Sequence, residues 1–128
     1  MAERNFFYSR NGRSKTVRKN CFWTEVNGTK YLVSYRTVVA AIDKDNYFHK
    51  FWNDYSVTTL NQVNQFINLF NDYGIYSEYD GTKIKGFNKK KWLEYPTGLV
   101  PKDDMQIIRP LIPYIEYNEW DYVKKIVY

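Results

Sequence analysis

Two groups of side chains in this sequence have the types and spacing to bind an anionic partner. One group of basic residues lies near the N-terminus, and the other combines lysines with a tryptophan between residues 83 and 92. Lysine and arginine pair with phosphate oxygens, and aromatic rings stack on nucleobases. These residue types therefore favour binding to a nucleic acid or to an acidic protein surface. The candidate residues are Arg10, Arg13, Lys15, Arg18, Lys19, Lys83, Lys85, Lys89, Lys90, Lys91 and Trp92.

The positive charge of the chain is concentrated in the first group. The formal net charge is +5, and residues 1–20 contain six basic residues and one acid, which already gives +5. Since residues 9–20 show no helical or strand periodicity, we predict a basic N-terminal arm, residues 1–20, before a single domain, residues 21–128. The arm would bind phosphate backbones or acidic surfaces by long-range attraction, or it would be a solubilising tail.

The second group also has two interpretations. Its lysines alternate with aromatic residues, as on a surface that stacks bases and pairs phosphates. In the structural alternative, Lys83 and Lys85 occupy the outer face of a short strand and Trp92 belongs to the core. The sequence favours this structural alternative.

The chain lacks the side-chain sets that most enzyme mechanisms require. It has one cysteine, Cys21, one histidine, His49, and no glycine-rich phosphate loop. A single cysteine excludes an internal disulfide and a multi-cysteine zinc site. Pairs of aspartates such as Asp103 and Asp104 occur in turn-like settings, where aspartate is common for conformational reasons. We therefore predict a protein that is not an enzyme and has no cofactor and no metal.

Length and hydropathy place the chain among small globular proteins. It has 128 residues, of which 26% are charged and 44% hydrophobic. No apolar run approaches the ~18 residues that a membrane helix needs, and no apolar signal segment follows the N-terminus. We therefore expect no membrane partner and a cytoplasmic location.

The elements that must position these residues form an α+β domain. Runs of strand-forming residues predict an antiparallel β-meander of four to five strands. Asn27-Gly28 is a strong hairpin turn signal, and Asp80-Gly81 marks a second hairpin. The segments with strand character, from which the four to five strands are expected, are residues 22–26, 30–35, 37–42, 47–52, 75–79 and 83–87, with 105–108 as a further candidate.

One central amphipathic helix is predicted over residues 59–73. Apolar residues recur there at helical spacing, Thr59 and Gln62 have the spacing of a capping box, and Gly74 suits the C-terminal end. Asn88 is expected to cap a helical turn through residue 94, and Asn118 a C-terminal helix. The meander is therefore expected to be packed by the central and C-terminal helices.

Two segments resemble a family. The strand Ser34-Tyr35-Arg36-Thr37-Val38-Val39-Ala40 and the helix start Tyr55-Ser56-Val57-Thr58-Thr59 are similar to a small domain of unknown function from phages of low-GC bacteria. The resemblance covers residues 31–70. Members often carry a histidine early in this helix, where this chain has Asn61, Gln62 and Asn64. The abundance of Tyr, Asn, Lys and Ile also indicates an AT-rich genome.

The resemblance implies a phage context, in which small basic proteins often block the host's nucleic-acid machinery. We expect a non-catalytic, phage-type binding protein that inhibits a host nucleic-acid-targeting defence complex by steric or electrostatic occlusion, as anti-CRISPR proteins do. Its partner would be a host nucleoprotein effector or nucleic acid, in the cytoplasm of the bacterial host cell. The alternatives are a DNA- or RNA-binding accessory or regulatory protein and a small virion component.

Overall fold

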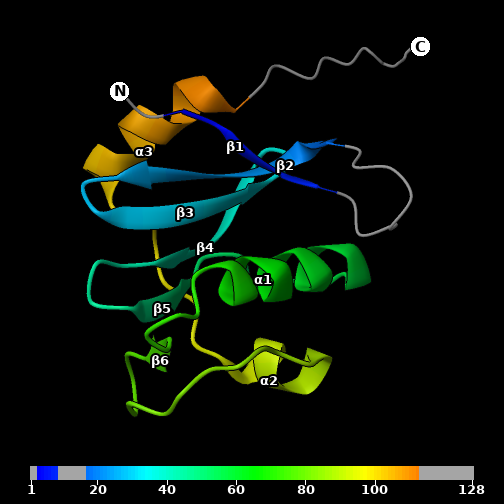
Figure 1. The fold of residues 1–128 in the computed structure, drawn as a ribbon, viewed down its shortest axis with the longest axis vertical. Helices are drawn as coiled ribbons and strands as arrows, with labels where there is room; N and C mark the ends of the chain where they lie inside the picture. Colours follow the sequence, from blue (N-terminus) through cyan, green and yellow to red (C-terminus); the bar gives the residue numbers. More distant parts are fainter. Residues whose placement is uncertain (1–2, 9–16, 113–128) are drawn as a thin grey trace.

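A six-stranded, mostly antiparallel sheet organises the chain, which confirms the predicted α+β class (Figure 1). The computed structural model describes residues 3–8 and 17–112. The strands follow one another in chain order across the sheet, and only the last pair is parallel. The strands are β1 (Asn5–Tyr8), β2 (Val17–Val26), β3 (Thr29–Ser34), β4 (Thr37–Ile42), β5 (Tyr47–Lys50) and β6 (Tyr76–Ser77).

The predicted meander over residues 22–52 is confirmed. Antiparallel pairing joins β2 to β3, β3 to β4 and β4 to β5. The turn between β2 and β3 consists of Asn27 and Gly28, and both have positive φ angles, 53° and 85°. These are the angles that a tight hairpin turn requires and that asparagine and glycine tolerate.

The prediction of a separate arm over residues 1–20 is wrong at both ends of that segment. Residues Asn5–Tyr8 form β1, which pairs with β2, and β2 already begins at Val17. The physical reason is burial, because the Phe7 side chain is 5% exposed and belongs to the core. Arg18 and Lys19 therefore lie in a strand. Arg10, Arg13 and Lys15 lie outside the described residues.

Helix α1 (Val57–Leu69) confirms the predicted central helix with different ends. Its cap is Ser56, whose hydroxyl oxygen accepts a hydrogen bond from the Thr59 backbone N–H at 3.1 Å. The predicted capping box is wrong, because the Gln62 side chain is buried and its oxygen accepts from the Ser34 hydroxyl at 2.6 Å. The helix thus begins two residues and ends four residues earlier than predicted.

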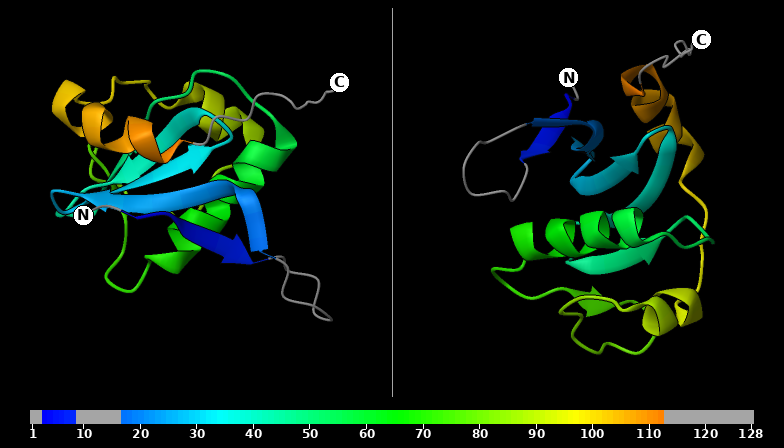
Figure 2. Two further views of the ribbon diagram at one scale, coloured as in Figure 1. Left: turned by 90° about the horizontal axis from the view of Figure 1, so that it is seen from above. Right: turned by 90° about the vertical axis from the view of Figure 1, so that its right-hand side faces the viewer.

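Two apolar clusters cover the two faces of the sheet, and Figure 2 shows α1 and the helical segment of residues 102–108 on opposite sides of it. On one face, Phe66 and Ile67 of α1 pack with Leu32 and Phe48. On the other face, Ile108 packs with Phe22, Tyr31, Val33 and Ala41. Side chains alternate between the faces of a strand, so neighbours in β3 enter different clusters. The remaining helices are α2 (Lys89–Glu94), α3 (Lys102–Ile108) and the short 3-10 helix η1 (Arg109–Leu111).

Two predicted strands are wrong. Residues 105–108 belong to α3, whose first turn carries Asp103 and Asp104, the charge that a helix N-terminus favours. Residues 83–87 do not form a strand. Within this range only Lys83 pairs, in an isolated bridge with Tyr76. Further along, the Phe87 backbone is hydrogen-bonded to a side chain of α1 and not to a strand. The C-terminal helix predicted from Asn118 lies outside the described residues.

In the described part of the chain, no helix combines the length and the apolar character that crossing a bilayer requires. The longest described helix is α1, which has 13 residues. A membrane-spanning α-helix needs about 20 mainly apolar residues.

Candidate functional site

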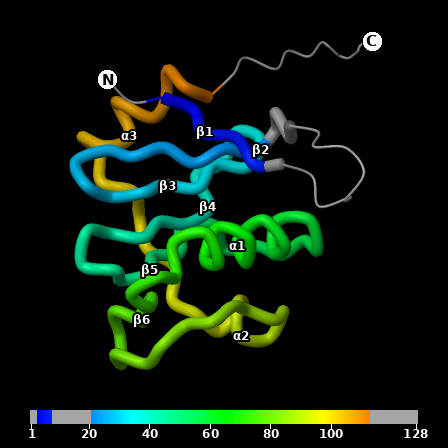
Figure 3. Tube along the Cα trace, viewed as in Figure 1, coloured from blue at the N-terminus to red at the C-terminus, as the bar shows by residue number. Residues whose placement is uncertain are grey.

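A groove of about 450 Å³ lies between the loop after β6 and helix α2; we call it the basic groove. The chain leaves β6, runs through this loop and enters α2 below α1 (Figure 3). Lys83 and Lys85 come from the loop and Lys91 from α2, and all three line the groove with Tyr79. The groove therefore gathers three of the predicted lysines from two segments.

None of the three lysines forms an ion pair with a carboxylate among the described residues. The ion pairs found among residues 3–8 and 17–112 both involve His49. Asp80 and Glu94 also line the groove. The Asp80 carboxylate accepts hydrogen bonds from the Thr82 backbone N–H and hydroxyl, at 3.0 and 2.7 Å. These bonds lower the Asp80 pKa, so its carboxylate stays ionised, and three lysines against Asp80 and Glu94 leave the groove lining net positive.

Tyr79 provides an aromatic surface beside the lysines. Its side chain is 53% exposed, and its ring meets the Tyr95 ring edge-on, with centroids 5.4 Å apart. Burial and the neighbouring Glu78 carboxylate raise the Tyr79 pKa, so the phenol stays neutral at physiological pH. A neutral, half-exposed ring next to free ammonium groups is suited to stacking on a base whose phosphates pair with the lysines.

Helix α1 fixes the loop that carries Lys85. The Asn64 amide nitrogen donates to the Phe87 carbonyl at 2.9 Å, and the Phe87 N–H donates to the Asn64 side-chain oxygen at 2.7 Å. A Cβ atom on Gly86 would lie 3.2 Å from that oxygen, which is tighter than ordinary contact. The amide-rich face of α1 therefore has a structural role at this position.

A buried lysine holds helix α2 in place. The Lys50 ammonium donates to the carbonyls of Trp92 and Tyr95, at 2.6 and 3.0 Å, at the C-terminal end of α2. It also lies 4.9 Å from the centre of the Trp92 ring. A cation at a helix C-terminus is favourable, although burial lowers the Lys50 pKa. This role of Lys50 was not predicted from the sequence, although a lysine among the aromatic residues 47–52 is the signal that marks it.

The structure separates the predicted binding residues. Lys83, Lys85 and Lys91 meet in the basic groove. Lys89 and Lys90 are exposed on α2 and do not line it. The predicted stacking role of Trp92 is wrong, because its side chain is 1% exposed and its indole N–H donates to the Asp54 carbonyl at 2.8 Å. The structural alternative was correct for this residue.

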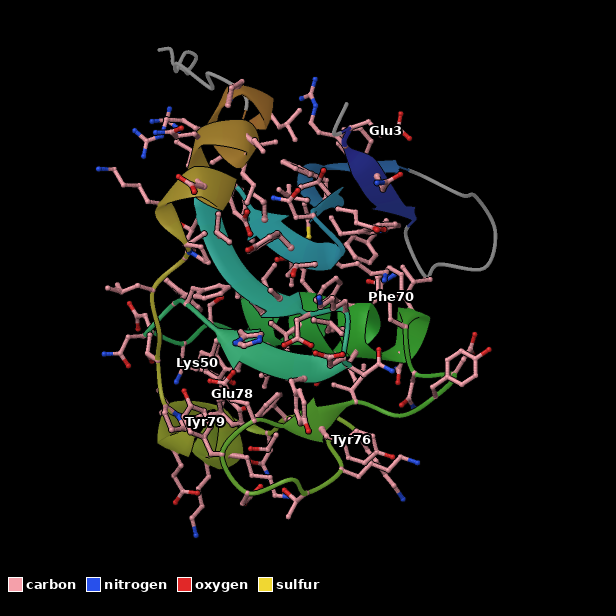
Figure 4. All side chains as sticks on the ribbon, turned by 90° about the vertical axis from the view of Figure 1, so that its left-hand side faces the viewer. Glu3, Lys50, Phe70, Tyr76, Glu78 and Tyr79 are labelled. Carbon is pink, nitrogen blue, oxygen red and sulfur yellow. The ribbon has the colours of Figure 1, made fainter. Side chains whose placement is uncertain are left out.

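A second cavity, of about 330 Å³, adjoins the basic groove, and Tyr79 lines both. We call it the aromatic cavity because His49, Phe51 and Tyr31 also line it. The two ring nitrogens of His49 lie 2.9 Å from an Asp43 oxygen and 2.7 Å from a Glu78 oxygen. Figure 4 shows Glu78 and Tyr79 beside Lys50, between β5 and α2.

The aromatic cavity was not predicted from the sequence. Its residues come from five separate segments, and the pairing of β5 with β6 brings Glu78 to His49. The signal that could have drawn attention to it is the acid Asp43, in the turn before the strand that carries the lone histidine. In the described part of the chain, no three His, Cys, Asp or Glu side chains are arranged to hold a metal ion.

Two residues that line the aromatic cavity are hydrogen-bonded to each other: the Tyr31 hydroxyl donates to the Asp104 carboxylate. Asp104 also accepts from the Asn27 amide at 3.2 Å, so this carboxylate connects α3 to the β2–β3 hairpin. Burial, and then the hydrogen bond to Asp104 and its charge, raise the Tyr31 pKa far above its usual value. A raised pKa in the folded state means that this contact stabilises the fold below about pH 10 and that the stabilisation is lost as pH rises further.

We predict that Tyr31→Phe lowers the free energy of unfolding by about 1.5–3 kcal/mol at pH 7, as for loss of a hydrogen bond to a charged group. The variant should also lose less stability than the native protein between pH 9 and 11. Tyr79 and Tyr95, whose pKa values are raised too, would supply the remaining alkaline dependence. Urea unfolding at several pH values measures both effects. Equal alkaline slopes in the two proteins would contradict the prediction.

The structure shows a six-stranded α+β fold, and comparison with known proteins assigns the chain to a family. A family of unknown function, DUF8033, matches residues 3–85, which is more than half of the chain, so the chain belongs to this family. No curated protein and no solved structure matches the chain. The family match ends at Lys85, so the basic groove joins lysines of the family segment to Lys91 beyond it.

Proposed function

We propose that this protein is a non-catalytic binding protein whose basic groove holds the backbone of a single-stranded nucleic acid. The observation that carries the proposal is the meeting of Lys83, Lys85 and Lys91, without carboxylate partners among the described residues, around the half-exposed Tyr79. Ammonium groups pair with successive phosphates while an aromatic ring stacks on a base, the combination typical of single-strand binding.

The exposed aromatic ring favours a single strand over a duplex. A base can stack on Tyr79 when it is free of its own neighbours, and bases in a duplex are already stacked and paired. A duplex would contact the lysines through its phosphates alone. We therefore expect both strand types to bind at low salt and the single strand to bind more tightly.

In biological terms, we propose that this binding acts in the cytoplasm of a bacterial host cell, where a phage protein covers a strand that a defence complex must reach. Inhibition of the anti-CRISPR kind would then follow from steric occlusion of that strand. A regulatory or accessory DNA- or RNA-binding role uses the same groove. A virion component would use it to contact packaged nucleic acid.

The test is fluorescence anisotropy with short labelled single-stranded and double-stranded oligonucleotides at two salt concentrations. The affinity for single strands should fall with salt, with a slope of about 0.7 per phosphate contact. Tyr79→Ala should weaken single-strand binding about tenfold, because one base–aromatic stack contributes about 1–3 kcal/mol. Duplex binding should change little.

The matched control is Tyr73→Ala, since Tyr73 is 87% exposed and does not line the basic groove. It removes the same type of side chain at a different exposed position. The proposal fails if the native protein binds no oligonucleotide at low salt. It also fails if the Tyr79 and Tyr73 variants lose the same affinity.

A further inference from the structure

We propose that the aromatic cavity receives one base of the strand bound in the basic groove, and that it selects guanine. This inference rests on the proposed function and adds sequence preference to it. The two cavities share Tyr79 as a common wall. A strand whose phosphates pair with Lys83, Lys85 and Lys91 therefore passes the opening through which a neighbouring base can enter.

The walls of the aromatic cavity suit a flat ring. Phe51 lies between Tyr31 and His49 in a nearly parallel series, with centroid distances of 6.1 and 6.2 Å and interplanar angles of 25° and 3°. The volume of about 330 Å³ lies in the range of small-ligand pockets, which are mainly apolar or aromatic with a few convergent polar groups. A purine fits this description of size and shape.

Leu99 extends the apolar surface of the aromatic cavity toward solvent. It lines the cavity and is nevertheless 92% exposed. The preceding Gly98 N–H donates to the Lys50 carbonyl at 2.8 Å, which fixes the loop that carries Leu99 next to β5. A base that entered the cavity would cover this exposed side chain, so the apolar surface of Leu99 would contribute to affinity.

The charged groups that remain for a ligand are carboxylates, beside the hydroxyls of Thr29 and Tyr79. Asp43, Glu78 and Asp104 line the cavity as carboxylates, and Glu78 is directly followed by the shared wall residue Tyr79. The Lys50 ammonium is directed at the carbonyls of α2, and both ring nitrogens of His49 are directed at carboxylates. The carboxylates therefore favour a ligand that supplies hydrogen-bond donors.

Guanine meets this requirement best among the four bases. Its Watson–Crick edge presents N1–H and the N2 amino group side by side, which matches the two oxygens of one carboxylate, and splayed-out bases are read on this edge. In uracil, one N–H lies between two carbonyl groups, and their oxygens repel a carboxylate. Adenine and cytosine offer an amino group beside an acceptor nitrogen. We assign this contact with the guanine edge to Glu78, the more exposed of the two carboxylates that hold His49.

The experiment compares an oligouridine with the same oligouridine carrying one central guanosine, by anisotropy with the native protein. The guanosine should raise the affinity about tenfold, the range of one good two-point base contact. Glu78→Gln should remove this difference while retaining the oligouridine affinity. Leu99→Ala should reduce the difference about threefold, since a small apolar contact is lost.

The control variant is Leu69→Ala, which shortens an exposed leucine on α1 that does not line the cavity. It should keep the full guanosine preference. If Glu78→Gln disturbs folding, the solvent-exposed Leu99 variant decides the question alone.

The outcomes separate the two proposals. Absence of any oligouridine binding would overturn the proposed function together with the guanine site. Binding of both oligonucleotides with equal affinity would overturn the guanine site and leave the basic groove supported. A guanosine preference that persists in both the Glu78 and the Leu99 variants would place recognition elsewhere and overturn this assignment.

Discussion

Replacing Lys83, Lys85 and Lys91 together by glutamine is expected to lower the affinity for a single-stranded oligonucleotide about 100-fold at low salt. Each lost phosphate contact should contribute about 1 kcal/mol. The slope of log affinity against log salt should fall by about two, because each phosphate contact on a single strand contributes about 0.7. The three side chains are exposed, so the free energy of unfolding should change little.

The control for this result must remove the same charge elsewhere. Lys44, Lys102 and Arg109 are exposed basic residues that do not line the basic groove. Their joint replacement by glutamine lowers the net charge equally, so long-range attraction weakens by a similar amount. We expect a loss of about threefold or less, mainly in the association rate. Equal losses in the two triple variants would show that net charge, and not the groove, determines binding.

Deleting the N-terminal segment cannot measure how its basic residues contribute to binding. A chain that starts at Phe22 would lack β1 and the first half of β2, and with them Phe7 of the core. Loss of binding in such a variant would report loss of the fold. Replacing basic side chains by glutamine within the full chain preserves the strand backbone and isolates the effect of charge.

The parts of the fold that the sequence predicts correctly depend on local signals. The meander follows from alternating residues joined by turns such as Asn27-Gly28, and α1 follows from its helical apolar spacing. Strand β1 was missed because four residues carry little periodicity and their pairing with β2 is a long-range contact. Helix α3 was mistaken for a strand because a short apolar run fits either structure.

In the candidate site, too, the residue types can be read from the sequence, but their arrangement depends on long-range packing. Composition identified the lysines, but the approach of Lys91 to Lys85 depends on two anchors that the sequence does not reveal. Asn64 ties the loop to α1, and Lys50 caps α2. Which aromatic ring stays accessible also depends on packing. Burial assigns Trp92 to the core and leaves Tyr79 at the surface.

Trp92→Ala tests whether Trp92 belongs to the core. We expect this variant to lower the free energy of unfolding by about 3–5 kcal/mol. The ring contacts Phe87 and Phe48 at centroid distances of 5.4 and 6.4 Å, and its N–H donates to the Asp54 carbonyl. Its removal leaves a large cavity beside the buried Lys50 ammonium, which lies 4.9 Å from the ring centre. Truncation therefore removes apolar packing, a hydrogen bond and a cation–π contact at once.

Chemical denaturation followed by circular dichroism measures this loss. Leu93→Ala is the control, because Leu93 is the next residue of the same helix and is exposed, so its truncation should change stability by about 0.5 kcal/mol or less. Trp92→Phe keeps an aromatic ring and should fall between the two variants. If Trp92→Ala were as stable as Leu93→Ala but bound oligonucleotides weakly, Trp92 would be a surface stacking residue after all. A stability loss confined to Trp92 would instead identify it as the residue that fixes α2, and with it Lys91, against the sheet.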